Sequence, residues 1–143
     1  MTIKDILNYN DAIKDIIDNT KNVNALVKFR LLGMCKQFEP IVSNYDVIYN
    51  EKIKQYGTVI DDRVGIIQPD RNKYSNEEEY NKAVEAYESS YKKFVDDMEQ
   101  VLNSEANINI QKFKYTDIID AGLPSEYLIA IYDLIEEWLG GIE

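Results

Sequence analysis

The sequence has 143 residues, of which 45% are hydrophobic and 29% are charged, a length and composition typical of one globular domain. Sixteen basic and 26 acidic residues give a net charge of −10 at pH 7, and such a negative field repels nucleic-acid phosphate and anionic lipid. We therefore expect a single helical domain over residues 1–143 that binds neither nucleic acid nor a membrane directly.

The residue types also limit the chemistry. The chain has no histidine and one cysteine, Cys35, so a Ser-His-Asp centre, a Cys-His centre and an internal disulfide are excluded. Neither glycine-rich phosphate motif, G-x-G-x-x-G or G-x-x-x-x-G-K-[ST], occurs. No stretch reaches the roughly 18 consecutive apolar residues of a membrane span, and the charged opening residues do not resemble a secretory signal. We expect a soluble cytoplasmic protein that is not an enzyme and has no catalytic residues and no cofactor.

The first predicted helix begins after Thr2, because Thr2 and Asp5 resemble a weak capping signal. Apolar residues over positions 3–17 fall near helical spacing. Asn8 and Asn10 could divide this segment into two short helices.

The next predicted helix spans Ala25 to Tyr56 and is about 48 Å long at about 1.5 Å per residue. Asn24 is placed to cap its start and Gly57 to end it. Pro40 should bend it, because proline removes an amide donor and clashes with the preceding turn. Apolar residues alternate in steps of four and three, the pattern of a heptad seam: Val27, Leu31, Met34, Phe38, Ile41, Tyr45 and Ile48.

Residues 57–75 mix glycine and proline with β-branched residues, which predicts a short strand near Arg63 to Gln68 and then a turn. The stretch from Ser75 to Glu78 is a capping box, with the serine hydroxyl as the cap of a second long helix. That helix repeats the heptad spacing along one face: Tyr80, Val84, Tyr87, Tyr91, Phe94, Met98 and Val101.

Two matching seams predict that the long helices pack as an antiparallel pair, or that they meet across a dimer interface. Residues 107–110 alternate polar and apolar side chains and predict a second strand, which could pair with the first. A last helix has Pro124 in its first turn and ends at Gly140-Gly141. Its apolar face contains Leu128, Ile131, Tyr132, Ile135, Trp138 and Leu139.

The expected fold is therefore mainly α with a small β element. It comprises a long antiparallel helical pair with heptad seams, a short two-stranded β element and a C-terminal amphipathic helix.

Four of the eleven tyrosines lie in the two seams: Tyr45, Tyr80, Tyr87 and Tyr91. A tyrosine ring packs against apolar groups while its hydroxyl needs a partner or water, so such a seam can be partly buried. It is either a core with a wet edge or part of an interface, where tyrosine is favoured. The candidate interface residues are these tyrosines and three acidic neighbours, Glu77, Glu78 and Glu79.

Other groups have structural explanations. Cys35 lies in the middle of a predicted helix and is interpreted as a small apolar residue, because thiol reactivity needs an electropositive, accessible setting. Acidic clusters such as Asp61-Asp62 and Asp96-Asp97 lack the ligand spacing of a calcium loop, so we expect solvated helix faces and no metal site. The acidic balance also admits a surface that imitates nucleic-acid phosphates.

Four stretches share an order of polarity and length with one known family. They are the helix from Ile6 to Ile17, the basic and apolar run from Val27 to Pro40, the helix end from Lys52 to Gly57, and the passage from Phe94 to Ile110. Together they resemble a family of small uncharacterised bacteriophage proteins, a conserved domain of unknown function, from which the chain departs in a longer polar insert over residues 70–81. The resemblance implies a viral origin. Because the family has no established catalytic residue, the resemblance implies no site.

Two functions are expected from these features. The first is a non-enzymatic, phage-encoded interaction protein that binds and occupies a host protein in the host cytoplasm, for example a defence or replication factor. The alternative is a virion structural or assembly protein, such as an accessory tail component or its chaperone, built as a homo-oligomer. An enzyme with a carboxylate-held magnesium site ranks below both. The expected partner is a protein, from the host or the phage.

Overall fold

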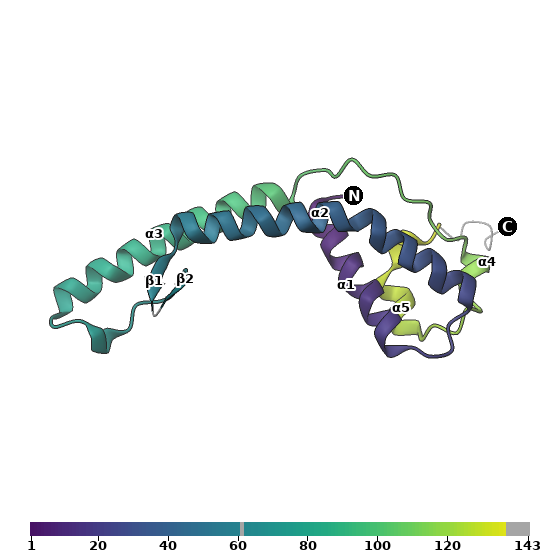
Figure 1. The fold of residues 1–143 in the computed structure, drawn as a ribbon, viewed down its shortest axis with the longest axis horizontal. Helices are drawn as coiled ribbons and strands as arrows, with labels where there is room; N and C mark the ends of the chain where they lie inside the picture. Colours follow the sequence, from purple (N-terminus) through teal and green to yellow (C-terminus); the bar gives the residue numbers. More distant parts are fainter. Residues whose placement is uncertain (61, 137–143) are drawn as a thin grey trace. The chain divides into compact units, whose positions relative to one another are not determined.

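The structure is a computed structural model that describes residues 1–60 and 62–136 (Figure 1). Helices make up 68% of it, and the described residues contain one sheet, of two strands. The prediction of a mainly α fold with a small β element is therefore confirmed. Met1–Val42 and Glu105–Glu143 form one compact unit, unit 1, and Ser43–Ser104 form another, unit 2. The single-domain organisation stays a prediction.

Unit 1 begins with helix α1, Ile3–Asn19, and the predicted cap is present. The Thr2 hydroxyl oxygen accepts a hydrogen bond from the Asp5 amide at 3.2 Å, and the Asp5 carboxylate accepts one from the Thr2 amide at 2.9 Å. The predicted break at Asn8 or Asn10 is wrong, because the helix is continuous. Asn10 is only 4% exposed and lies on the buried face, and packing of that face outweighs the low helix propensity of asparagine.

Helix α2 spans Ala25–Tyr56, as predicted. The Asn24 side chain caps it by accepting hydrogen bonds from the amides of Leu26, at 2.9 Å, and Val27, at 3.2 Å. Pro40 lies inside the helix, which continues on both sides of it; the bend stays a prediction. Residues 25–42 of α2 belong to unit 1 and residues 43–56 to unit 2.

The hydrophobic core lies in unit 1. It takes side chains from α1, from the first half of the α2 seam and from the segment after residue 112. Its buried residues are Ile6, Tyr9, Ile13, Ile16, Val27, Leu31, Met34, Phe38, Phe113, Ile118, Ala121, Leu123, Ile131 and Leu134. Because each fully buried large apolar side chain contributes about 1.5–3 kcal/mol, this cluster is the main source of stability in unit 1.

The C-terminal part of unit 1 contains helices α4, Tyr115–Ile118, and α5, Ser125–Ala130, and the 3₁₀ turn η2, Tyr132–Leu134. The predicted long C-terminal helix is wrong within the described residues, since α5 stops at Ala130 and Pro124 is its N-cap. Ile135 instead pairs with Phe113 in a parallel bridge.

Backbone hydrogen bonds explain this early stop. The Phe113 amide donates to the Leu134 carbonyl at 2.9 Å, and the Glu136 amide donates to the Phe113 carbonyl at 2.7 Å. A helix through Ile135 would leave the buried Phe113 backbone without these partners. The predicted helix positions Trp138, Leu139 and Gly140-Gly141 lie outside the described residues.

The predicted strand over residues 107–110 is also wrong. The chain in this region is irregular, and Ile108 and Ile110 pack against the core of unit 1 without joining a sheet. Pairing occurs slightly earlier, where Glu105 forms an antiparallel bridge with Thr2 and its carboxylate contacts the amino group of Met1 at 2.9 Å.

The β element is a hairpin in unit 2, formed by β1, Thr58–Ile60, and β2, Arg63–Gly65. Val59 pairs with Val64 in an antiparallel register. The strand predicted near Arg63 is thus present but shorter, and its partner is the segment just before it. Asp62 in the two-residue connection has φ 64, a left-handed conformation that aspartate tolerates better than most residues.

Helix α3, Glu77–Leu102, follows the short 3₁₀ turn η1, Arg71–Lys73. Its N-cap is Asn76, whose side chain accepts a hydrogen bond from the Glu79 amide at 2.8 Å. The predicted cap at Ser75 is therefore wrong by one residue. The Ser75 hydroxyl instead donates to the Glu79 carboxylate at 3.0 Å.

Residues 43–56 of α2 and helix α3 run antiparallel within unit 2 (Figure 1). Tyr49 contacts Phe94, whereas Tyr56, farther along α2, shares a pocket with Tyr87, which lies earlier on α3. The predicted antiparallel pair therefore involves only the second half of the α2 seam, because the first half packs into the core of unit 1. None of the helices that the structure describes combines the length and apolar composition that a membrane crossing requires.

Candidate functional site

All seven candidate interface residues lie in unit 2. Tyr45 is on α2, and the other six are on α3. The structure divides them into separate groups along the helix pair.

Tyr87 and Tyr91 form the first group. They are four residues apart on α3, so they share one face of the helix, and their rings stack with centroids 5.9 Å apart and an interplanar angle of 27°. Tyr87 is half-buried, whereas the Tyr91 side chain is 50% exposed. Tyr91 is therefore a surface aromatic residue whose ring is supported by Tyr87.

Tyr45 belongs to a second group, which joins the two helices. Its ring lies 6.1 Å from that of Tyr49, and the Tyr49 ring meets Phe94 edge-on at 5.4 Å. Burial, and then the neighbouring Tyr49 and Asp46, raise the pKa of Tyr45, so its hydroxyl stays neutral at physiological pH. Tyr91 lies three residues before Phe94 and on the same face of α3. We call the residues of these two groups the aromatic surface of unit 2: Tyr45, Tyr49, Tyr87, Tyr91 and Phe94.

Tyr80 lies apart from that surface, near the start of α3. Its ring meets Tyr74 edge-on with centroids 5.9 Å apart, and the Arg71 guanidinium lies 5.2 Å from the centroid of the Tyr80 ring. These contacts hold η1 and the loop after it against α3. A structural role accounts for Tyr80.

Glu77, Glu78 and Glu79 occupy the exposed first turn of α3. Acidic residues are favoured there, because the amino end of a helix carries a partial positive charge. Glu79 accepts the hydrogen bond from Ser75, and Glu78 contacts Lys82 at 3.6 Å. The contacts of Glu78 and Glu79 are thus at the start of the helix and not with the aromatic surface. All three glutamates are favoured at this end of the helix by its partial positive charge.

A polar cluster ties the helices together beside the aromatic surface. The Tyr56 hydroxyl donates to the Asp97 carboxylate at 2.7 Å, and the Lys52 ammonium lies 3.2 Å from the same oxygen. The hydrogen bonds from Tyr56 and Lys52 lower the pKa of Asp97, and the bond to Asp97 raises the pKa of Tyr56. Both shifts favour the hydrogen-bonded pair with a charged carboxylate and a neutral hydroxyl.

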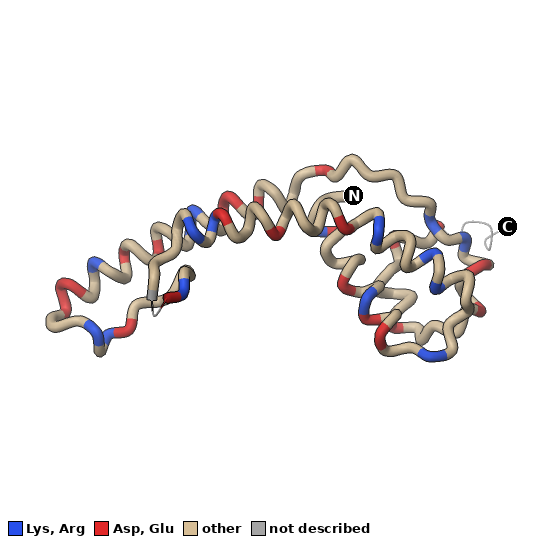
Figure 2. The backbone as a smooth tube through the Cα atoms, viewed as in Figure 1, with Lys and Arg blue, Asp and Glu red and all other residues tan. Residues whose placement is uncertain are grey.

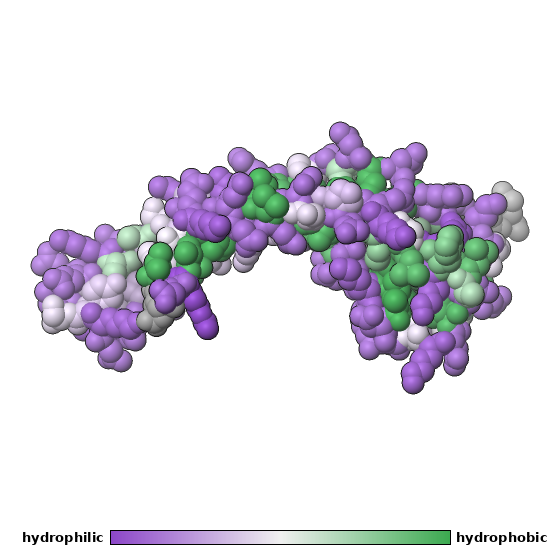
Figure 3. All heavy atoms as spheres, in the orientation of Figure 1, coloured by the Kyte–Doolittle hydropathy of each residue, from purple (hydrophilic) through white to green (hydrophobic). Residues whose placement is uncertain are grey.

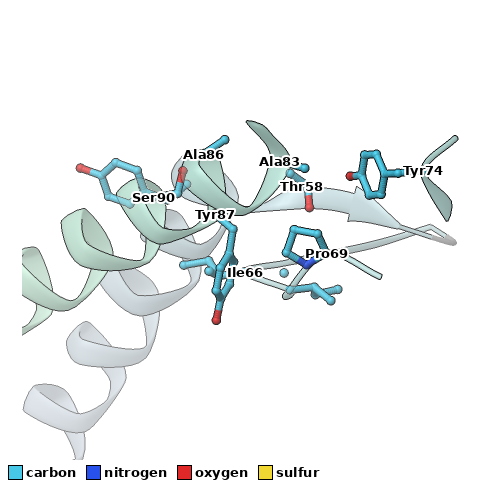
Figure 4. Close-up of a pocket in the computed structure, with 11 residues that line it drawn as sticks. Thr58, Ile66, Pro69, Tyr74, Ala83, Ala86, Tyr87 and Ser90 are labelled. Carbon is cyan, nitrogen blue, oxygen red and sulfur yellow. The ribbon is translucent and has the colours of Figure 1, made fainter. Parts of the chain in front are cut away.

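A pocket of about 240 Å³ lies between α3 and the hairpin region (Figure 4). Ala83, Ala86 and Ser90 of α3 line one side, and Thr58 of β1 and Pro69 of the following loop line the other. Small-molecule sites usually measure about 300–1,000 Å³, so this pocket is suited to a single side chain. Sequence reasoning missed it, although the three small residues recur at helical spacing opposite a proline-containing loop.

Unit 2 buries little of its apolar surface. Among its described side chains, Met98 is the one that is buried, at 5% exposure. Figure 3 shows apolar side chains, in green, reaching the surface over the hairpin. The large hydrophobic residues of unit 2 that are 37% to 71% exposed are Val47, Tyr49, Val59, Val64, Ile67, Tyr74 and Tyr91.

The chemistry expected of Cys35 agrees with its environment. Burial raises the pKa of its half-buried thiol, against a smaller opposing effect of Lys14, so little thiolate forms near neutral pH. Within residues 1–60 and 62–136, no group of three or more histidine, cysteine, aspartate or glutamate side chains gathers as metal ligands would.

No family model, curated protein or solved structure matches the chain.

Proposed function

We propose that the chain is a non-enzymatic interaction protein, encoded by a bacteriophage, that binds and occupies a host protein in the host cytoplasm. The contact is made through the aromatic surface of unit 2, and a host defence or replication factor is the kind of target that fits. The observation that supports this proposal is the low burial of apolar side chains in unit 2, where Met98 is the one buried side chain among those described.

The physical reason is the imbalance between apolar residues and the core that they form. A folded unit usually gains its stability by removing large apolar side chains from water. In unit 2, Tyr49 and Tyr91 are 40% and 50% exposed although they lie beside half-buried seam residues. Tyrosine is enriched in protein interfaces, and buried aromatic anchors there provide much of the binding energy. A partner that covers these rings would complete the burial.

Affinity capture with a matched pair of variants tests the proposal. The tagged wild-type chain, Tyr91→Ser and Tyr132→Ser are each expressed in the bacterial host, with and without infection, and co-purifying proteins are identified by mass spectrometry. Tyr132 is a suitable control, because it is 67% exposed and lies in unit 1. We expect one host protein with the wild type and the control, and a loss of at least tenfold with Tyr91→Ser. Equal recovery with all three chains would contradict the proposal.

A virion structural or assembly protein is the second candidate. The specific observation in its favour is that two antiparallel helices with matching seams leave most seam residues half-buried. A second copy of unit 2 could complete a four-helix bundle. Light scattering then gives a fixed oligomer, and the chain is found in purified particles; a monomer that is absent from particles would eliminate this candidate.

A further inference from the structure

The first turns of α2 carry apolar side chains on two opposite sides. One side is the buried seam described above. On the other side, Leu26, Phe29 and Leu32 are 67%, 72% and 42% exposed. A surface helix normally has one apolar stripe, and a helix that is apolar all round is usually covered on every side. The exposed side, which we call the outer face of α2, comprises Leu26, Phe29, Leu32 and Gly33.

The outer face has the shape of a docking surface. Leu26, Phe29 and Leu32 recur every three positions, and Gly33 lies four positions after Phe29, so they form one stripe along the helix. A Cβ atom added at Gly33 would meet nothing within 4 Å, which leaves the helix backbone open to a close approach. A pocket of about 350 Å³ that includes Leu32 and Lys36 flanks the stripe, and another of about 290 Å³ includes Gly33 and Arg30.

The stripe has a positive border in a negatively charged protein. Lys28, Arg30 and Lys36 fall within residues 25–38, a stretch without aspartate or glutamate. Figure 2 shows basic positions, in blue, along the first half of α2. Lys14 of α1 lines the same pocket as Leu32. In the part of the chain that the structure describes, the ion pairs involve Met1, Lys52 and Lys82, so none of these four cations forms one. Glu39 lines the same pocket as Lys14 and Lys36 without pairing with either.

Contacts with Phe113 and Lys112 hold the Arg30 side chain in position. Its guanidinium lies 4.3 Å from the centroid of the Phe113 ring and donates a hydrogen bond to the Lys112 carbonyl oxygen at 3.2 Å. A guanidinium has five donors, so others remain for an incoming carboxylate. One border of the outer face is therefore a fixed positive group.

We propose that the outer face of α2 binds an acidic amphipathic helix of a partner protein. The apolar side of such a helix covers Leu26, Phe29 and Leu32, and its carboxylates meet Lys28, Arg30 and Lys36, which is the helix-in-groove mode with complementary charge. A second copy of this face would bring the same cations together, with Glu39 as the carboxylate of the flanking pocket. Cations outnumber this carboxylate, and like charges oppose that contact. The outer face lies in unit 1 and is independent of the aromatic surface of unit 2.

A random library of 16-residue peptides, selected on the immobilised full-length chain, tests this proposal and does not require the partner to be identified first. We expect selected peptides to be rich in aspartate and glutamate and to carry leucine, isoleucine or phenylalanine at spacings of three and four. Their affinity, measured by fluorescence anisotropy, should fall at least tenfold with Phe29→Ser. It should also fall with the double charge reversal Lys28→Glu and Lys36→Glu, and more so at low salt, where exposed charges are least screened.

A matched variant distinguishes binding at this face from nonspecific binding to exposed apolar side chains. Ile129→Ser removes an apolar side chain that is 74% exposed in the same unit but lies on α5, so it should leave peptide binding unchanged. Thermal unfolding of each variant confirms that it is folded. Peptides without acidic residues, or peptides that bind Phe29→Ser as well as the wild type, would overturn the proposal.

Two further measurements distinguish other occupants of the outer face. Phe29-dependent binding to phosphatidylserine vesicles, in the absence of peptide binding, would assign the face to a lipid surface and overturn the proposal. Phe29-dependent self-association in light scattering would assign it to a second copy and overturn it equally. We expect neither.

Discussion

Single tyrosine hydroxyls join distant segments within each unit. Tyr9 of α1 donates a hydrogen bond to Asp133 in η2, and Tyr56 donates to Asp97 across the helix pair of unit 2. Burial, and then the bond to Asp133, raise the pKa of Tyr9, so its hydroxyl remains a donor throughout the physiological range. The sequence marks neither contact, because the partners are 124 and 41 residues apart.

Tyr9→Phe is expected to destabilise the chain by roughly 1–3 kcal/mol, because it keeps the buried ring but removes a hydrogen bond to a charged group. The pKa of Tyr9 is raised in the folded state, so its contribution is present below about pH 10 and is lost as the pH rises through the folded value. Urea denaturation should therefore give the same difference from wild type at pH 6 and pH 8. Tyr132→Phe, at a 67% exposed position, is the control, and equal stability of the two variants would contradict this role.

Asp97→Asn should lower the unfolding temperature near neutral pH, because it removes the charge that Tyr56 and Lys52 contact. The pKa of Asp97 is lowered in the folded state, so its contribution is present above about pH 4 and is lost as the pH falls through the folded value. Thermal scans from pH 3 to pH 7 should show the difference from wild type shrinking towards acid. The same substitution at the exposed neighbour Asp96 should have little effect at any pH.

At the scale of elements, local signals in the sequence predict helix ends better than packing partners. Asn24 and Gly57 limit α2 as predicted, because capping depends on residues within a few positions. The C-terminal helix was predicted too long, because Ile135 pairs in a parallel β-bridge with Phe113. Phe113 lies some twenty residues earlier, so local spacing does not reveal this pairing. Spacing showed that α2 has a seam but not that Phe38 belongs to one unit and Tyr45 to the other.

The two sides of α2 provide a matched test at this scale. Leu31 is fully buried and its neighbour Leu32 is 42% exposed. Leu31→Ala should cost about 2–5 kcal/mol, because it leaves a cavity in the core, whereas Leu32→Ala should change the free energy of unfolding by no more than about 0.5 kcal/mol. Chemical denaturation of both variants gives the comparison. Similar losses would show that the outer side of α2 is packed in the free chain.

At the scale of the whole molecule, burial divides the chain unevenly, since the core cluster lies in unit 1 and Met98 is the buried side chain described for unit 2. The seven residues predicted from the sequence all fall in unit 2, but Tyr80, Glu78 and Glu79 make local contacts there that lie apart from the aromatic surface. The outer face of α2 was not predicted from the sequence, because the heptad pattern follows the opposite, buried side of the helix. Its signal was Leu26, Phe29 and Leu32 at off-seam positions.

Hydrogen exchange should reveal this uneven burial. Amides in α3 are expected to exchange faster than those in α1, because local opening exposes little additional apolar surface where few side chains are buried. Mass spectrometry of the free chain at neutral pH measures both helices together. Equal protection of α1 and α3 would mean that the side chains of unit 2 are as well packed as those of unit 1 in the free chain. It would weaken the proposed role of the aromatic surface.

The most direct test of the interaction role is photo-crosslinking at Tyr91 in living host cells. A photoreactive phenylalanine analogue is placed at Tyr91 in one chain and at Tyr132 in another, and the cells are illuminated before purification. The account predicts a crosslink to one host protein from position 91 and none to that protein from position 132. Crosslinks from position 91 to a second copy of the chain, or to nothing, would contradict it.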